Sequence, residues 1–182
     1  LTDPDLNDGR PRQLEERRRT WARKRPFWSA PTDAVDRATV ALPKLLYERM
    51  DELGMDFTVL YPSMGLFTSH IQGDKDLRRL ACRAYNIYAM DMVGGYADRM
   101  TPVGVIPMHT PKEALAELDY AVSELGYKAV TLEGTVHRPI PSLEGARGDE
   151  GRATTRMELF ALDSEHDYDP VWAKCVELKV AA

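Results

Sequence analysis

The sequence predicts an α/β fold in which parallel strands alternate with helices. Three short, nearly continuous apolar runs, residues 57–61, 101–109 and 127–134, each follow a stretch with the three-to-four-residue apolar spacing of a helix. Strands that are apolar along their whole length are typical of a parallel sheet covered on both faces. The period also appears in the letters, because ELGMDFTVLYP and ELGYKAVTLEG share one pattern and the terminal VELKVAA begins it again.

The first predicted helix lies in LPKLLYERMDELG, with Pro43 in its first turn and Gly54 at its end. Its apolar residues have helical spacing: Leu42, Leu45, Leu46, Met50 and Leu53. The first strand follows at residues 57–61. After it, in YPSMGLFTSH, we expect Met64 and Phe67 to form a hydrophobic wall or part of the core, and His70 to be an ordinary loop residue.

Two further helix and strand pairs follow. The helix in DKDLRRLACRAYNIYAMDMVGGYADRM is long and should loosen at Gly94 and Gly95, before the strand in TPVGVIPMH. The helix in TPKEALAELDYAVSELG has Thr110 as its cap, Pro111 in its first turn and Gly126 at its close. Its strand is YKAVTLEG.

The overall composition indicates a globular chain of one domain or part of one, with 182 residues, 43% of them hydrophobic, and a net charge of −5. No apolar run approaches the roughly 20 residues of a membrane span, and the N-terminus lacks the pattern of a signal peptide. We therefore expect a cytoplasmic protein with no membrane partner. Cys82 and Cys175 lie in helical patterns and outside any CxxC pair, which favours buried free thiols.

Residues 1–40 are predicted to form a basic aromatic arm or loop. Arg and Lys are concentrated between Arg10 and Arg25, interleaved with Trp21, Phe27 and Trp28. Such a stretch could bind phosphates or stack on bases. No motif of a nucleic-acid-binding fold accompanies it, so we expect a solvated arm or helix whose aromatic residues dock on its own domain, and nucleic acid stays the minor alternative.

Residues 139–162 are polar, charged and rich in glycine, and they predict a long loop that forms a lid, a subunit contact or a disordered segment. His166 follows among Asp163, Glu165, Asp167 and Asp169. Such a cluster could bind a cation, but its place just before a helix favours capping of the free backbone amides.

Several stretches together resemble the amidohydrolase-2 family, the aminocarboxymuconate-semialdehyde-decarboxylase-like metal-dependent hydrolases and decarboxylases. The resemblance runs from about Ala41 to the end, with an interruption over residues 139–162. Its most specific features are a helix containing Asn86, then Asp98-Arg99 and a strand ending in Pro107, and the helix start DPVW at residues 169–172.

The resemblance implies that residues 41–182 are part of a (β/α)8 TIM-type barrel, with about three of its β/α units, apparently truncated at both ends. It also implies a divalent metal, zinc first, held by a His-x-His or Glu-x-His pair on the first strand, a His ending the fifth and an Asp ending the eighth. None of these ligands can be matched in this sequence. The segment alone is therefore expected to lack the metal and to be inactive.

Our candidate site residues follow the predicted strands, whose ends face the mouth of such a barrel. His109 is a candidate catalytic residue that could orient a substrate carboxylate, or else a loop histidine bonded to nearby backbone. Glu133 is a candidate catalytic carboxylate. His137, in a predicted loop, is a candidate for binding substrate, and the two side chains could serve as acid and base. Both could equally be solvated. Ser63 is a candidate for binding substrate.

The expected function is therefore a segment of a metal-dependent enzyme that hydrolyses or non-oxidatively decarboxylates a small carboxylate or aromatic acid. The sequence contains no G-x-S-x-G, Walker A or G-x-G-x-x-G motif to favour other hydrolases, kinases or dehydrogenases. The alternative is a noncatalytic α/β binding or scaffold module whose basic arm holds an acidic partner. Leu1 and the unfinished VELKVAA phrase indicate a piece of a longer protein. Unclosed strand edges predict that this piece alone forms a homo-oligomer or folds poorly.

Overall fold

The computed structural model describes residues 34–140, 154–159 and 163–182. The chain divides into two compact units, Leu1–Arg49 and Met50–Ala182. Most of the predicted basic arm and residues 141–153 of the predicted loop lie outside the described residues.

The described part of the first unit contains α3 (Ala34–Ala41) and α4 (Pro43–Arg49). Arg49 joins the two helices, because its Nη1 donates to Asp36 Oδ1 at 3.0 Å and to Thr39 Oγ1 at 2.6 Å. The helix predicted to end at Gly54 is α4, which is shorter and ends at Arg49. Residues 50–54 form turns, and Gly54 has a φ of 68°, a conformation that favours glycine.

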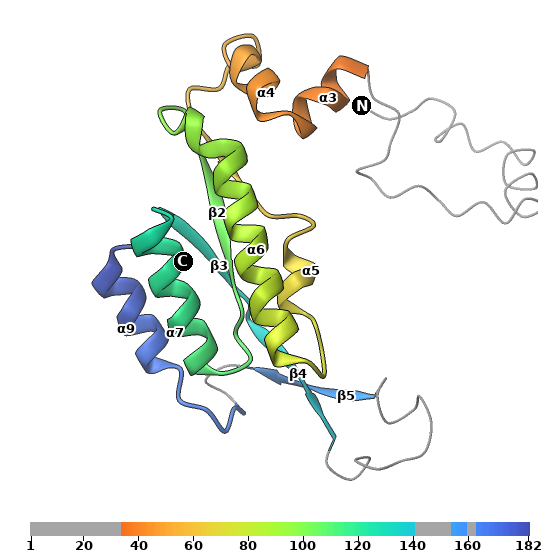
Figure 1. The fold of residues 1–182 in the computed structure, drawn as a ribbon, viewed down its shortest axis with the longest axis vertical. Coiled ribbons are helices and arrows are strands. Elements are labelled where there is room, and N and C mark those ends of the chain that lie inside the picture. The colour runs from red at the N-terminus through yellow and green to blue at the C-terminus, as the bar shows by residue number, and fades with distance from the viewer. Residues whose placement is uncertain (1–33, 141–153, 160–162) are drawn as a thin grey trace, which may run out of the picture. The chain divides into compact units, whose positions relative to one another are not determined.

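The second unit is built on a parallel sheet of β1 (Thr58–Leu60), β2 (Met100–Ile106) and β3 (Ala129–Leu132), in that order (Figure 1). Val59 lies opposite Thr101, and Gly104 lies opposite Val130. All three predicted strands are present, and their parallel pairing confirms the α/β prediction.

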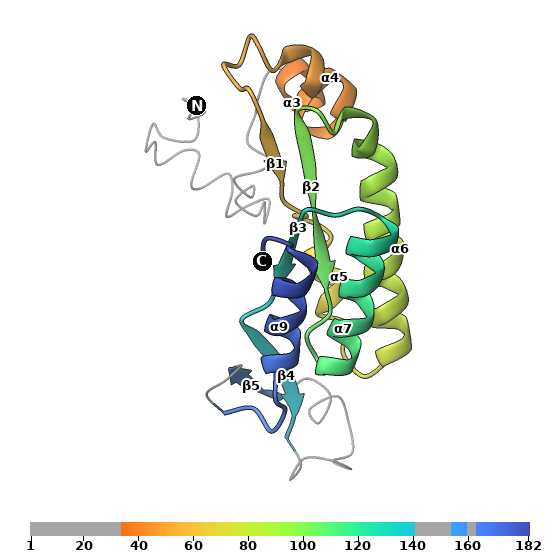
Figure 2. The same cartoon turned by 90° about the vertical axis from the view of Figure 1, so that its left-hand side faces the viewer.

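Three helices run alongside this sheet: α6 (Lys75–Val93), α7 (Pro111–Asp119) and α9 (Asp169–Leu178) (Figure 2). A shorter helix, α5 (Leu66–Ser69), follows β1. The core between α7, α9 and the sheet is formed by buried apolar side chains, which include Ile106, Leu118, Tyr127, Val130, Val171 and Cys175. Both cysteines are free and buried as predicted, and burial raises the pKa of Cys82 to about 11.

The helix ends follow the predicted signals. Thr110 Oγ1 accepts a hydrogen bond from the Glu113 amide at 3.2 Å, and Pro111 occupies the first turn of α7. The α6 helix passes into a 3-10 turn, η2 (Gly94–Tyr96), at the predicted glycine pair. After α7 the chain continues as a π-helix, η3 (Tyr120–Glu124), and reverses at Gly126, whose φ is 82°.

Asn86 joins α6 to the central strand. Its side-chain oxygen accepts from the Val105 amide at 2.8 Å, and its side-chain nitrogen donates to the Val105 carbonyl and to Glu117 Oε1, each at 2.9 Å. The side chain is fully buried. One amide therefore satisfies both backbone groups of a residue in β2 and a carboxylate of α7.

The predicted loop over residues 139–162 contains a strand, so the loop interpretation is wrong for that part. β4 (Thr135–Pro139) and β5 (Thr155–Leu159) form an antiparallel hairpin, with His137 opposite Met157. The polar sequence TRMEL did not predict β5, because the buried residue of this strand is the charged Glu158, which forms an ion pair with Arg138. His137 accordingly lies in a strand and not in a loop.

No helix within the described ranges is both long enough and apolar enough to cross a membrane.

Candidate functional site

The candidate site lies where the parallel strands end. Tyr61 follows β1 directly, Glu133 follows β3 directly, and His109 closes the short segment after β2. Because parallel strands present their carboxyl ends at one edge of a sheet, the topology brings these residues to the same edge. This is the placement that the sequence predicted for His109 and Glu133.

His109 is a buried histidine whose hydrogen-bonding capacity is unused. Its side chain is 7% exposed, and neither ring nitrogen has a hydrogen-bond partner in the part of the chain that the structure describes. Burial lowers its pKa to about 3, with a further contribution from the positive charge of Arg78. At neutral pH the ring is uncharged, so that one nitrogen can donate a hydrogen bond and the other can accept one.

Glu133 has one engaged and one free carboxylate oxygen. Its Oε1 contacts the Ser69 hydroxyl and lies 3.2 Å from His70 Nε2. Its Oε2 is buried and has no partner among the described residues. A buried polar atom without a partner is rare in native proteins, so the free oxygen points to a ligand.

Ser69 and His70 are site residues that the sequence interpretation missed. The fully buried Ser69 hydroxyl lies between Glu133 Oε1 and the Leu66 carbonyl oxygen, which is 2.7 Å away. His70 was expected to be an ordinary loop residue, and its contact with Glu133, 3.2 Å from Nε2 to Oε1, corrects that expectation. The useful signal was its position after a strand, on the same edge as Glu133.

The other predicted residues do not join this group. Ser63 is exposed and does not line the pocket described below. His137 Nδ1 lies 3.0 Å from Thr155 Oγ1 in the hairpin, so the imidazole in contact with Glu133 is that of His70. Met64 and Phe67, considered as wall or core, are 75% and 66% exposed and are not core residues.

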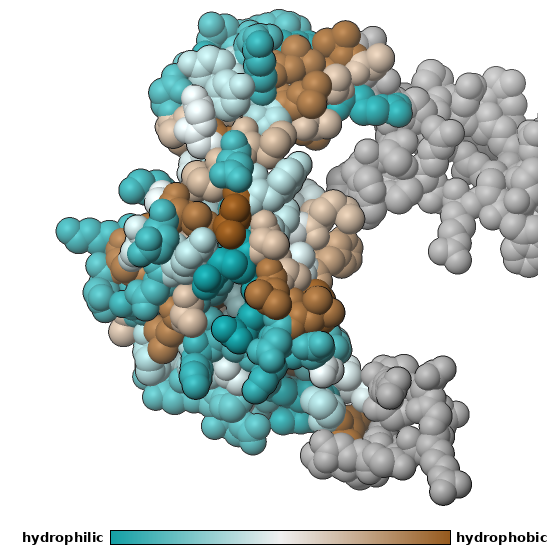
Figure 3. Space-filling model, viewed as in Figure 1, coloured by the Kyte–Doolittle hydropathy of each residue, from teal (hydrophilic) through white to brown (hydrophobic). Residues whose placement is uncertain are grey.

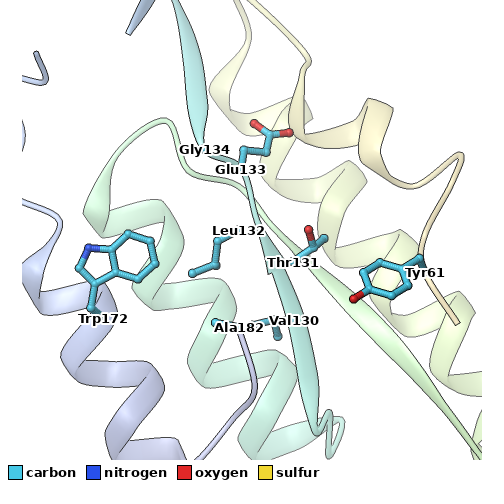
Figure 4. A pocket seen from close by; sticks show the side chains of 8 residues that line it. All are labelled: Tyr61, Val130, Thr131, Leu132, Glu133, Gly134, Trp172 and Ala182. Atoms are coloured by element: carbon cyan, nitrogen blue, oxygen red, sulfur yellow. The ribbon is translucent and has the colours of Figure 1, made fainter. Parts of the chain in front are cut away.

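A pocket of about 590 Å³ runs along β3 and is lined in part by Glu133, whereas His109, Ser69 and His70 do not line it (Figure 4). Thr131 and Glu133 enter it from β3 and its end, Tyr61 comes from the end of β1, and Trp172 comes from α9. Val130, Leu132, Gly134 and Ala182 complete the lining. Aromatic rings, a hydroxyl and a carboxylate make this a suitable surface for a small molecule that is partly aromatic and partly polar.

The described residues do not make a metal site by themselves. No group of three or more His, Cys, Asp and Glu residues within residues 34–140, 154–159 and 163–182 could hold an ion. The acidic residues around His166 are included in this statement. Asp167 there accepts a hydrogen bond from the Asp169 amide at 2.9 Å, at the start of α9, in line with the capping interpretation.

Comparison with known proteins shows one family and one group of solved structures. A family model described as amidohydrolase matches residues 12–182. Dihydroxybenzoic acid decarboxylase from Polaromonas sp. JS666, solved with manganese and the inhibitor 2-nitroresorcinol, is 22% identical; the match covers 73% of this chain and 35% of that chain, with a TM-score of 0.54.

Two further decarboxylases match most of this chain. The 2,6-dihydroxybenzoate decarboxylase from Rhizobium is 17% identical over 94% of this chain and 45% of its own, with a TM-score of 0.55. The 5-carboxyvanillate decarboxylase from Novosphingobium aromaticivorans DSM 12444, solved with manganese and 3-methoxy-4-hydroxy-5-nitrobenzoic acid, is 16% identical over 93% of this chain and 44% of its own, with a TM-score of 0.52.

These likenesses show the fold. The parallel β/α units correspond to part of the TIM-type barrel of these decarboxylases, as the sequence predicted. The chain spans less than half the length of each of these structures.

Proposed function

Because this chain belongs to the amidohydrolase-2 family, we propose that it is a segment of a metal-dependent enzyme that decarboxylates or hydrolyses a small carboxylate. Non-oxidative decarboxylation of an aromatic acid is the favoured reaction, since the structural neighbours named above are decarboxylases of substituted benzoates. The manganese bound in two of these structures supports a divalent metal, while zinc stays a prediction from the sequence.

The observation that carries this proposal is the set of unused polar atoms at the strand ends. Both ring nitrogens of His109 and Oε2 of Glu133 are buried without a partner among the described residues. Leaving such atoms unpaired costs about 1–3 kcal/mol each, so a fold that keeps them there has a use for them. Barrel enzymes place their substrate contacts at this edge.

The geometry supports distinct roles for the two residues. The uncharged His109 ring can donate one hydrogen bond to a carboxylate or phenolate oxygen of the substrate. Glu133, held through Oε1 by Ser69 and His70, keeps Oε2 free to accept a proton or a hydrogen bond from a substrate hydroxyl. Tyr61 and Trp172 offer rings against which an aromatic substrate can lie.

The metal has a limited place in this proposal. The described residues do not fit a complete metal site, so the metal ligands would come from other residues of the protein. The predicted homo-oligomer and the predicted cytoplasmic location stay predictions. The alternative binding module depends on the basic arm, which lies largely outside the described residues.

The test is an assay of the whole protein that contains this segment. Purified enzyme is incubated with 2,6-dihydroxybenzoate and related hydroxybenzoates, and released CO2 and the decarboxylated phenol are measured. We expect chelation to abolish turnover, added Mn²⁺ or Zn²⁺ to restore it, and His109→Gln to lower kcat/KM by about 100-fold or more, the loss typical for one transition-state hydrogen-bond donor.

Each contrary result has a clear meaning. Turnover that survives chelation would remove the metal from the proposal, and full activity of His109→Gln would remove His109 from the site. Hydrolysis of amide or lactone substrates without CO2 release would favour the hydrolase reaction. Salt-sensitive binding of an acidic protein, lost on deletion of residues 10–28, with no turnover of any acid, would favour the binding module.

A further inference from the structure

The hairpin of β4 and β5 is tied to the segment that carries His109. The bond is made by Tyr168, which lies just before α9 and is only 3% exposed. Its hydroxyl donates a hydrogen bond of 2.7 Å to the carbonyl oxygen of Met108. Met108 is the neighbour of His109 in the chain and is itself fully buried, so this bond fixes the backbone from which the His109 side chain extends.

The Tyr168 hydroxyl is oriented by an ion pair in the hairpin. Arg138 Nη2 donates to the Tyr168 hydroxyl oxygen at 3.3 Å and to Glu158 Oε1 at 2.8 Å, while its Nε donates to Glu158 Oε2 at 3.1 Å. Because the Tyr168 hydroxyl oxygen accepts a hydrogen bond from Arg138, its single proton is left to donate to the Met108 carbonyl.

Glu158 is the buried centre of this network. It is fully buried and also accepts hydrogen bonds from Ser164 Oγ at 2.8 Å and from Arg156 Nη2 at 3.3 Å. The hydrogen bonds from Arg138 lower the pKa of Glu158, so it is ionised at neutral pH.

Stability alone is a weak reason for such an arrangement. A buried ion pair gains little over well-packed apolar side chains, because the cost of removing both charges from water offsets their attraction. What an apolar replacement could not do is fix the direction of a hydroxyl group. The network ends on the carbonyl beside His109, at the edge where the site lies.

We propose that Tyr168, oriented by the Arg138–Glu158 ion pair, is a positioning residue that holds His109 at the strand end with its ring nitrogens available to substrate. The proposal deepens the proposed function and rests on it for the role of His109. The hairpin thereby becomes part of the support of the site.

The charged and titratable groups around His109 come from several elements. Arg78 lies on α6, His70 follows α5, and Arg138 and His137 lie on β4; all four act electrostatically on His109. A substitution of Arg138 would therefore change position and charge together. Tyr168→Phe removes only a hydroxyl, and it is the cleaner variant.

The matched control is Tyr127→Phe. Tyr127 is also buried, at 1% exposed, and its hydroxyl likewise donates to a backbone carbonyl, that of Asn86, at 2.8 Å. Both substitutions delete one buried hydrogen bond to a carbonyl. Only Tyr168→Phe deletes one beside His109, and it also removes the acceptor of the 3.3 Å bond from Arg138. Similar losses of Tm are expected for the two variants.

The experiment titrates His109 by NMR in the 182-residue chain with ¹⁵N-labelled histidine, assigned through His109→Gln. We expect the pKa of His109 to rise from about 3 toward the ordinary 6.5 in Tyr168→Phe, because the released segment lets water reach the ring, and to stay unchanged in Tyr127→Phe. If both variants lose the same Tm and leave the titration of His109 unaltered, Tyr168 is merely structural and the proposal is overturned.

Glu158→Gln gives a second test that does not depend on the folding of Tyr168→Phe. Removing a negative charge would by itself lower the pKa of His109, so a rise can come only from release of the segment. A further fall would overturn the proposal. The titration needs no turnover, so its result is independent of the assay of the whole protein. An inactive whole protein together with a shifted His109 titration in Tyr168→Phe would refute the proposed function and keep the positioning role. An active whole protein with an unshifted titration would do the reverse.

Discussion

The buried His109 makes the free energy of unfolding depend on pH. Its pKa is about 3 in the folded chain and about 6.5 in an exposed histidine. Between these values the unfolded chain binds a proton that the folded chain excludes. The free energy of unfolding therefore falls as the pH falls from about 6.5 toward 3, by up to about 1.4 kcal/mol for each pH unit.

This leads to a prediction for His109→Gln. Lowering the pH from 7 to 5 should reduce the free energy of unfolding, measured with urea, in the original chain. The reduction should be clearly smaller in the variant, since the variant has no group to protonate at this position. The comparison within one pH range cancels the titration of the carboxylates, which both chains share. Equal losses in the two chains would show that His109 is not shielded from solvent.

The site residues show how much of the site the sequence contains. The rule that parallel strands end at a shared edge was enough to select His109 and Glu133. It could not reveal that His70 and Ser69 contact Glu133, because these residues are more than sixty positions apart and their contact depends on how α5 turns back after β1. Ser63 fulfilled the same rule and is nevertheless exposed.

The helix α6 is joined to the rest of the second unit by polar side chains as well as by packing. Arg78 forms a bidentate pair with Glu113 of α7, with Nε–Oε2 and Nη2–Oε1 distances of 3.1 Å. Arg83 Nε donates to Glu117 Oε2 at 2.8 Å, and Asn86 reaches the same carboxylate and β2. Three polar side chains of α6 therefore reach α7, and one of them, Asn86, also reaches the sheet.

We predict that Asn86→Ala destabilises the protein by at least about 2 kcal/mol, because it leaves the buried amide and carbonyl of Val105 and one oxygen of Glu117 without their partner. The control on the same helix is Arg79→Ala, which removes an exposed ion pair with Asp76 and should change the free energy of unfolding by less than about 0.5 kcal/mol. Similar values for the two variants, measured by chemical denaturation, would argue against this role of Asn86.

Elements could be predicted from the sequence to different degrees. Helices with a cap and a terminal glycine, such as α7, and apolar strands, such as β2, carry local signals and were found. β5 was missed because it has no apolar alternation, and its one buried position is a carboxylate whose partner lies in β4. Local patterns cannot show a strand that is held by a charge from elsewhere.

Several large apolar side chains of α5 and α6 are exposed. Figure 3 shows apolar surface over this part of the second unit. We call the exposed residues involved the α5–α6 patch: Phe67, Leu77, Leu80 and Tyr88, each between 53% and 67% exposed. The three residues on α6 have helical spacing and so share one side of the helix. Such patches commonly mark contacts between proteins.

We expect the predicted homo-oligomer to form through the α5–α6 patch. Sedimentation velocity of the 182-residue chain should show a mass that rises with concentration, and Leu80→Glu should shift it toward the monomer. The control is Val176→Glu on α9, which charges an apolar side chain of similar exposure, 78%, outside the patch. A chain that is monomeric at every concentration would exclude this assembly, and equal effects of both variants would exclude the patch.

The contacts that hold the candidate site join residues far apart in the sequence, and this separation affects how late the site forms during folding. Tyr168 reaches Met108 across 60 residues, and Ser69 reaches Glu133 across 64, whereas the caps of the helices join neighbours in the chain. Closing long loops costs entropy before any contact repays it, so short-range helices form early and these two links form late. Maturation of the strand-end edge should therefore lag behind helix formation during refolding, and the site should be the first region to exchange its amide hydrogens when the native state opens.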